Sequence, residues 1–137
     1  MEKATEEDRM EKRVYWIEHK GNRILYVDYA GLRDEAAYLQ VVDEFESAIL
    51  SQPVGRQVLT IVDVANSVLT PRITQRNKEV MARAKAKGIP DSPTALIGLT
   101  GLKMAVVQAM QFMRPDLHPT DNIEEAKDWL VQQRSGK

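Results

Sequence analysis

The sequence predicts an α/β fold with a mixed sheet of four or five strands and about four helices. Its most informative stretch runs from Gln57 to Asn77, and it begins with the run from Val58 to Val62, which is almost entirely apolar and rich in β-branched residues. Such a run is typical of a strand that helices cover on both faces of a sheet. Strand-like runs alternate along the chain with segments whose apolar residues recur every three or four positions. This alternation is typical of β-α-β units, whose crossovers are right-handed and whose strands run parallel.

The first two strands are joined differently from the others. Val14–His19 and Arg23–Tyr29 are both rich in β-branched and aromatic residues, and only Lys20, Gly21 and Asn22 lie between them. A Gly-Asn pair at this spacing is typical of a tight hairpin turn. We therefore expect an antiparallel pair at the start of the sheet, which makes the sheet mixed.

A helix is expected after this hairpin. Asp34 can cap its first turn, and the stretch from Gln52 to Gly55 contains the proline and glycine that end it. One apolar stripe runs along the helix, formed by Tyr38, Val41, Val42, Phe45, Ala48 and Ile49.

The central strand spans residues 57–63 and leads through a polar loop to a second helix. Thr70 supplies an N-cap, and Pro71 fits the first helical turn because its missing amide would have no partner there. This helix is expected to end at Lys87, before Gly88.

The last third of the chain holds another strand and two further helices. Thr94–Leu99 is a second buried strand, and an apolar helix is expected over Leu102–Met113. The loop Arg114–Asn122 has room for a short fifth strand, and Ile123–Gln133 forms the final helix.

Composition limits the classes of function. The 137 residues fit one domain, expected over 13–133, with a charged flexible leader at 1–12 and a short tail at 134–137. A net charge of −1 gives no general attraction to nucleic acid or anionic membranes. The chain has no cysteine, no signal peptide and no apolar run that spans a bilayer. We expect a cytoplasmic protein without an integral membrane segment.

The loop after the central strand is the first candidate site. Asp63 ends the strand, and Asn66, Ser67 and Thr70 follow at the position where open α/β sheets bind ligands. Hydroxyls here could carry or bind a phosphate beside the positive end of the next helix. The structural alternative is that Asp63 accepts hydrogen bonds from loop amides, and that Thr70 only caps the helix.

A basic arc on the second long helix is the next candidate. At 100° per residue, Arg72, Arg76, Arg83 and Lys87 lie on one side of the helix. The arc is either a solvated face or a surface for an acidic protein partner or phosphorylated ligand. Nucleic acid is not expected, because no aromatic residues are interleaved with the charges to stack on bases.

The expected helix at 102–113 is apolar on most of its sides, more than core packing alone requires. It is expected to line an apolar pocket or a homodimer contact, or to lie wholly within the core. The pocket candidates are Met104, Ala109, Met110 and Met113.

No catalytic or metal signature stands out. His19 and His118 are the only histidines, and the turn-rich stretch from Asp116 to Asp121 reads as a loop rather than a metal site. There is no nucleophile elbow for a Ser-His-Asp triad. We expect a protein that is not an enzyme and that binds no metal or cofactor.

Three segments resemble the STAS-type superfamily, which has the fold of bacterial anti-sigma-factor antagonists and transporter tails. They are H-K-G-N-R-I-L-Y-V-D-Y-A-G-L, V-L-T-I-V-D-V and E-E-A-K-D-W-L, and the resemblance covers residues 13–133. It is nearest to a bacterial branch that is often grouped with CRAL-TRIO lipid-binding domains. Signalling members carry a phosphorylatable serine in Asp-Ser-Ser/Thr-Gly after the central strand. Here that stretch is N-S-V-L-T-P without the glycine, and Ser67 or Thr70 is the nearest equivalent.

Two functions follow from these observations. The first is a non-catalytic regulatory or protein-interaction module that presents the loop at 63–74 and the basic arc to a protein partner. The alternative is a binder of a small apolar or lipid-like ligand, held in a pocket beside the helix at 102–113.

Overall fold

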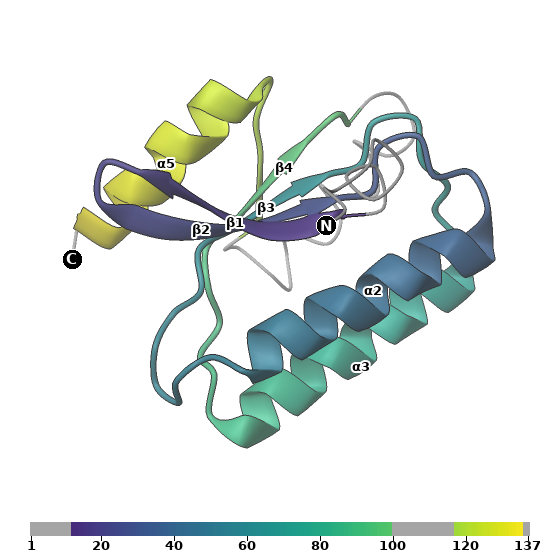
Figure 1. The fold of residues 1–137 in the computed structure, drawn as a ribbon, viewed down its shortest axis with the longest axis horizontal. Coiled ribbons are helices and arrows are strands. Elements are labelled where there is room, and N and C mark those ends of the chain that lie inside the picture. Colours follow the sequence, from purple (N-terminus) through teal and green to yellow (C-terminus); the bar gives the residue numbers. More distant parts are fainter. Residues whose placement is uncertain (1–11, 100–116, 136–137) are drawn as a thin grey trace, which may run out of the picture.

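The described part of the chain forms a mixed five-stranded sheet with two helices on one face and a third helix on the other (Figure 1). This is a computed structural model, which describes residues 12–99 and 117–135. The strands lie side by side in the order in which they occur in the chain. The prediction of an α/β fold with a mixed sheet is confirmed, and of the four or five strands predicted the described part of the chain has five.

The hairpin is built from β1 (Val14–His19) and β2 (Asn22–Asp28), which pair antiparallel. The turn between them has positive φ angles at Lys20 (52°) and Gly21 (80°). Two consecutive residues with positive φ match the right-handed twist of the flanking strands, which is why glycine suits this turn. The turn therefore sets the register of β1 on β2.

The other strands run parallel to β2. They are β3 (Thr60–Asp63), β4 (Thr94–Ile97) and β5 (Leu117–Pro119). The strand predicted over 57–63 begins only at Thr60 in the structure, and just before it the amide of Val58 donates to the Ser92 hydroxyl (2.8 Å). The carbonyl of Leu59 still accepts from the Leu25 amide (2.9 Å), so the segment before Thr60 keeps a backbone hydrogen bond to β2.

Two long helices cover one face of the sheet. The first, α2 (Glu35–Leu50), has Asp34 as its N-cap, and the second, α3 (Pro71–Lys87), has Thr70. At the end of α3, Gly88 adopts φ 102°, a left-handed conformation that favours glycine. The predicted bounds of α3 are confirmed.

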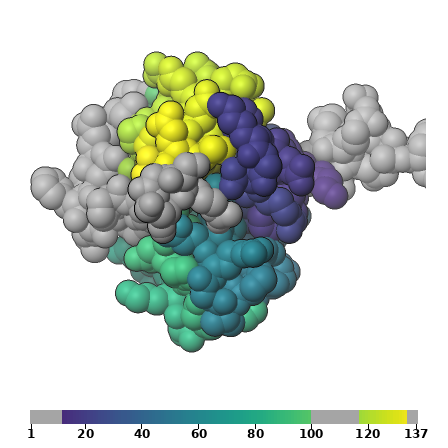
Figure 2. Space-filling view, turned by 90° about the vertical axis from the view of Figure 1, so that its left-hand side faces the viewer, coloured from purple at the N-terminus to yellow at the C-terminus, as the bar shows by residue number. Residues whose placement is uncertain are grey.

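The third described helix, α5 (Ile123–Ser135), lies on the opposite face. Figure 2 shows α5 beside the hairpin, on the side of the molecule away from α2 and α3. His19 Nε2 lies 2.8 Å from Asp128 Oδ1, which ties the end of β1 to α5. The helix predicted over Leu102–Met113 lies outside the described residues.

Alternation along the strands divides the core into two layers. On β2, Leu25 and Val27 pack with α2 and α3, whereas Ile24 and Tyr26 face α5. This is the two-residue period of a strand that is buried on both faces. The two layers share the sheet and have separate helical partners.

Candidate functional site

A pocket of about 170 Å³ lies between the sheet and the layer of α2 and α3. We call it the sheet pocket. Its floor comes from one face of four neighbouring strands, through Val27, Thr60, Val62, Thr94, Leu96 and Leu117. Because residues two apart on a strand share a face, the parallel register brings these side chains together. The pocket is therefore a direct product of the sheet's topology.

The roof of the sheet pocket comes from the two helices. Its lining there is Tyr38, Phe45, Ile49, Asn77, Met81 and Ala84. Three of the lining residues have short side chains: Ala84 in the roof, and Thr60 and Thr94 in the floor. Larger residues at these positions would occupy the space, so the sequence leaves the pocket open by its choice of small residues.

The hydroxyls of the pocket wall are already engaged. Thr60 Oγ1 donates to the carbonyl of Val58 (2.9 Å), and Thr94 Oγ1 donates to that of Ser92 (3.1 Å). Ser92 Oγ donates to the carbonyl of Pro90 (3.0 Å) and accepts from the Val58 amide. The polar atoms of these three residues serve the backbone, which keeps this part of the lining effectively apolar.

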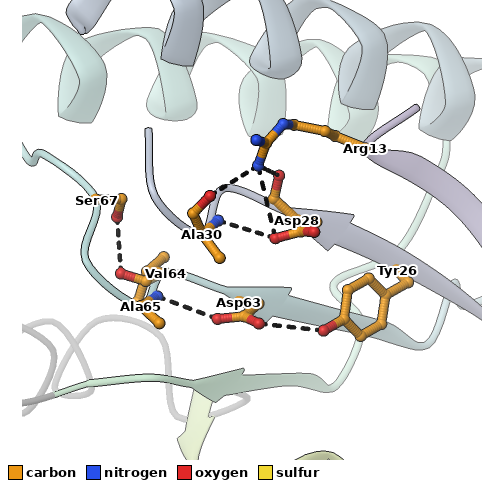
Figure 3. A network of polar contacts seen from close by, with 8 residues as sticks. All are labelled: Arg13, Tyr26, Asp28, Ala30, Asp63, Val64, Ala65 and Ser67. Carbon is orange, nitrogen blue, oxygen red and sulfur yellow. Dashed lines mark hydrogen bonds and ion pairs between the residues drawn. The ribbon is translucent and has the colours of Figure 1, made fainter. Parts of the chain in front are cut away.

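Asp63, the first predicted site residue, makes a local turn. Its Oδ1 accepts from the Ala65 amide (3.0 Å), and its Oδ2 accepts from the Tyr26 hydroxyl (3.2 Å) (Figure 3). Burial raises the pKa of Tyr26 well above its usual range, and the negative charges of Asp63 and Asp28 raise it further. The tyrosine therefore stays a neutral donor, and the structural alternative for Asp63 describes these contacts.

Asp28 repeats this turn on the neighbouring strand, where the sequence interpretation missed it. Its Oδ1 accepts from the Ala30 amide (2.9 Å), and Arg13 Nη1 donates to the Ala30 carbonyl (2.8 Å) (Figure 3). Asp28 and Asp63 are register partners at the carboxyl ends of β2 and β3. The signal was present in the sequence, because Val-Asp-x-Ala occurs at the end of both strands.

Ser67 and Asn66 belong to the same loop. Ser67 is only 6% exposed, and its Oγ donates to the Val64 carbonyl (2.8 Å). Asn66 has φ 54°, a left-handed conformation that asparagine tolerates better than most residues. These contacts give both residues a role in the shape of the loop, while phosphorylation of Ser67 stays a prediction.

Thr70 is the N-cap of α3, as predicted. Its Oγ1 accepts from the Ile73 amide (3.2 Å) and donates to Glu35 Oε2 (2.6 Å) at the start of α2. The hydroxyl therefore links the first turns of the two helices. Modification of Thr70 stays a prediction, and it would have to displace both contacts.

Gly98 holds this loop against the end of β4. It has φ 83°, and a Cβ atom at this position would lie 2.5 Å from the Ala65 amide nitrogen. Backbone at this distance cannot move aside without changing the loop, so only glycine fits. The close approach of two backbone segments explains this glycine.

The central part of the predicted basic arc lies against acidic residues of α2. Arg76 Nη2 contacts Asp43 Oδ1 (2.8 Å) and Glu46 Oε1 (2.7 Å), and Arg83 Nη1 contacts Glu46 Oε2 (2.5 Å). Hydrogen bonds from Arg76 and then Arg83 lower the pKa of Glu46. Both arginines therefore connect α3 to α2, a contact that the sequence interpretation missed because it considered the charges of α3 alone.

The ends of the arc differ from each other. Lys87 Nζ donates to the carbonyl of Leu50 at the end of α2. Arg72 is 76% exposed and lies 3.9 Å from Glu35, a weak contact in solvent. A partner-binding role for the arc stays a prediction, and Arg72 is more exposed than Arg76 and Arg83.

The predicted apolar pocket residues, Met104, Ala109, Met110 and Met113, lie outside the described residues. The sheet pocket was not predicted from the residues that line it. One signal was available: Asn77 lies four residues after Ile73 and three before Val80, on the apolar stripe of α3. A polar residue in such a stripe often marks a functional position.

We compared the chain with known proteins, and the similarity that we found concerns the fold. Neither the family models nor the curated proteins give a match to this chain. Among solved structures, the chain is similar to an uncharacterised protein of the DUF3478 family with a SpoIIAA-like fold from Shewanella loihica PV-4. The TM-score is 0.65 at 16% sequence identity, over 85% of this chain and 91% of that chain. The protein has a SpoIIAA-like fold, which confirms the STAS-type prediction for the architecture.

No helix within the described ranges is long and apolar enough to cross a membrane.

Proposed function

We propose that this protein is a non-catalytic SpoIIAA-like module that holds a small apolar molecule in the sheet pocket. The observation that carries the proposal is a pocket of about 170 Å³ whose floor and roof are mainly aliphatic and aromatic. An apolar cavity of roughly 150 Å³ accepts a molecule the size of benzene. The pocket therefore suits a ligand of one ring or an equivalent aliphatic group.

Burial of apolar surface would supply most of the binding energy. Very small ligands gain at most roughly 1.5 kcal/mol per non-hydrogen atom, and most gain far less. We therefore expect simple one-ring probes to bind with Kd values of about 0.01 to 1 mM. The natural ligand would bind more tightly if it also satisfies polar groups of the lining.

The contacts around the pocket support the non-catalytic part of the proposal. A hydroxyl nucleophile needs a neighbouring base that takes its proton. Among the described residues, the hydroxyls of Thr60, Ser92 and Thr94 donate to backbone carbonyls instead. This arrangement favours holding a ligand over transforming it.

Native mass spectrometry of the freshly purified protein, together with a toluene titration, tests the proposal. We expect either a small adduct that is lost on denaturation or a saturable rise in Tm with toluene. Ala84→Leu should abolish both effects, because Ala84 lines the pocket. If the wild-type protein carries no adduct and toluene leaves its Tm unchanged, the proposal is wrong.

A protein-interaction module is the second candidate function. Leu69 is 41% exposed, and it lies three residues before the exposed Arg72 at the start of α3. An exposed apolar residue near an exposed cation suits an acidic protein partner. Loss of a co-purifying protein in the Leu69→Ser, Arg72→Glu double variant would support this function. Val54→Ser is the control, because Val54 is also exposed (66%) and precedes β3.

A further inference from the structure

We infer that the ligand of the sheet pocket carries one uncharged polar group, a hydroxyl or a carbonyl, which hydrogen-bonds to the side-chain amide of Asn77. The inference rests on the proposed function, because it assigns a chemical class to the molecule in the pocket. It narrows that class from any apolar molecule to one with a single neutral polar group.

Asn77 occupies a core-facing position of α3. Residues three, four and seven apart share a face of a helix. Ile73, Val80 and Ala84 lie four, three and seven residues from Asn77, and all three are buried. Asn77 itself lines the sheet pocket and is half-buried. The amide therefore faces the space in which a ligand would lie.

The Asn77 amide differs from the hydroxyls of the pocket wall. A side-chain amide offers two donor hydrogens and an acceptor oxygen. Within residues 12–99 and 117–135, no side chain or backbone group hydrogen-bonds to it, whereas Thr60 and Thr94 donate to nearby carbonyls. A ligand that fills the pocket takes the amide out of water, so it must supply a hydrogen bond or bind more weakly.

The charges of the lining indicate a neutral ligand. The described lining contains no lysine, arginine or histidine that could balance the carboxylate of a fatty acid. Its one carboxylate is Asp91, which is exposed. Burial raises the pKa of both Tyr29 and Tyr38, so these residues stay neutral. An ion would lose its hydration in the pocket without gaining a partner of opposite charge.

Matched probes test this inference by calorimetric titration. Toluene, p-cresol and benzoate have similar sizes. p-Cresol adds one hydroxyl to toluene, and benzoate has a carboxylate in place of the methyl group. We expect the wild-type protein to bind p-cresol more tightly than toluene and to reject benzoate. In Asn77→Leu the ratio of the two Kd values should shift about tenfold or more toward toluene, since the hydroxyl then enters without a partner. Asn77→Ala provides the same test if the leucine variant does not fold.

The controls separate the outcomes. Gln75→Leu changes an exposed residue of the same helix and should leave the ratio unaltered. Tyr38→Phe removes a hydroxyl from the roof, and a shift in this variant but not in Asn77→Leu would overturn the assignment to Asn77. Equal ratios in the wild-type protein and both Asn77 variants, or tight benzoate binding, would also overturn it while the proposed function stands. If no probe binds the wild-type protein, this inference is wrong, and the proposed function is wrong as well if the freshly purified protein carries no adduct.

Discussion

The two faces of the sheet are made from the same strands, but they differ in how completely they are filled. On the α5 face, Ile24, Ile61 and Leu130 are fully buried in one cluster that contributes no residue to the sheet pocket. On the α2–α3 face, the core continues around a pocket of about 170 Å³. One face thus supplies close packing, and the other combines packing with space for a ligand.

The difference arises from single side chains and not from the backbone. Leu59, just before β3, and Ile61 on β3 face α5, while Thr60 and Val62 form part of the pocket floor. Because successive side chains of a strand point to opposite faces, neighbouring residues pack against α5 or line the pocket in turn. A sheet covered on both sides can keep one face for stability and leave the other for binding.

Truncation of a large side chain is expected to give the largest contrast. Leu130→Ala on the filled face should lower the free energy of unfolding by about 2 to 5 kcal/mol, since it leaves a cavity in close packing. Met81→Ala should cost only about 1 kcal/mol, because Met81 is half-buried and already borders the pocket. Urea unfolding measures both values. Equal losses would show that the α2–α3 face is packed as closely as the other.

Enlargement of an alanine reverses the test. Ala126 on α5 and Ala84 on α3 are both buried, and only Ala84 lines the pocket. Ala126→Leu should destabilise by about 1 to 3 kcal/mol through overpacking, whereas Ala84→Leu should change stability by less than about 1 kcal/mol. Thermal and urea unfolding of the two variants provide the comparison. A loss in Ala84→Leu as large as in Ala126→Leu would mean that the pocket cannot hold three added carbons.

A bound probe should stabilise the folded protein only through contacts in the sheet pocket. At ten times its Kd, a ligand that binds only the folded state stabilises it by about 1.4 kcal/mol. We expect this gain with p-cresol in the wild-type protein and in Asp128→Asn, which changes the α5 side. The gain should disappear in Ala84→Leu. Its survival in that variant would place the probe outside the sheet pocket.

The smallest expected difference between the two faces is in the stability that each loses at low pH. Hydrogen bonds from Arg76 and Arg83 lower the pKa of Glu46, and one from His19 and then Lys20 lowers that of Asp128. A carboxyl whose pKa is lower in the folded state stabilises it above the unfolded pKa, and this is lost as pH falls through the folded pKa. The loss for Glu46 therefore lies below pH 4.5, its ordinary pKa.

Variants of the two carboxyls test this contrast by unfolding between pH 2.5 and about 6. Glu46→Gln should flatten the acid dependence more than Asp128→Asn, because Asp128 is 51% exposed and its contacts are screened by solvent. A steeper change in Asp128→Asn would show that acid acts mainly on the α5 face.

Local signals explain why most of the fold could be predicted. The turn at Gly21 and the caps at Asp34 and Thr70 depend on a few adjacent residues, and the structure confirms all three. The parallel order of β2, β3 and β4 follows from the helices α2 and α3 that connect them. The predicted start of the central strand was too early, and there the Val58 amide bonds to Ser92, a residue far away in the sequence.

The candidate site was harder to predict, because it depends on where separate elements meet. The pocket combines side chains from four strands and two helices, and the pairing of Arg76 with Glu46 joins two helices. Neither can be derived from a periodicity within one segment. Two features were nevertheless visible in the sequence: the repeated Val-Asp-x-Ala at two strand ends and the polar Asn77 in an apolar stripe.

The sheet pocket also has a consequence for how the protein responds to hydrostatic pressure. Pressure favours the state of smaller volume, and unfolding eliminates internal voids, so the volume change of unfolding becomes more negative as voids increase. The sheet pocket lies between the sheet and the layer of α2 and α3, so we expect the space that unfolding eliminates to lie mainly on this face. We therefore expect pressure to destabilise this face first, and a molecule that fills the pocket to reduce that effect.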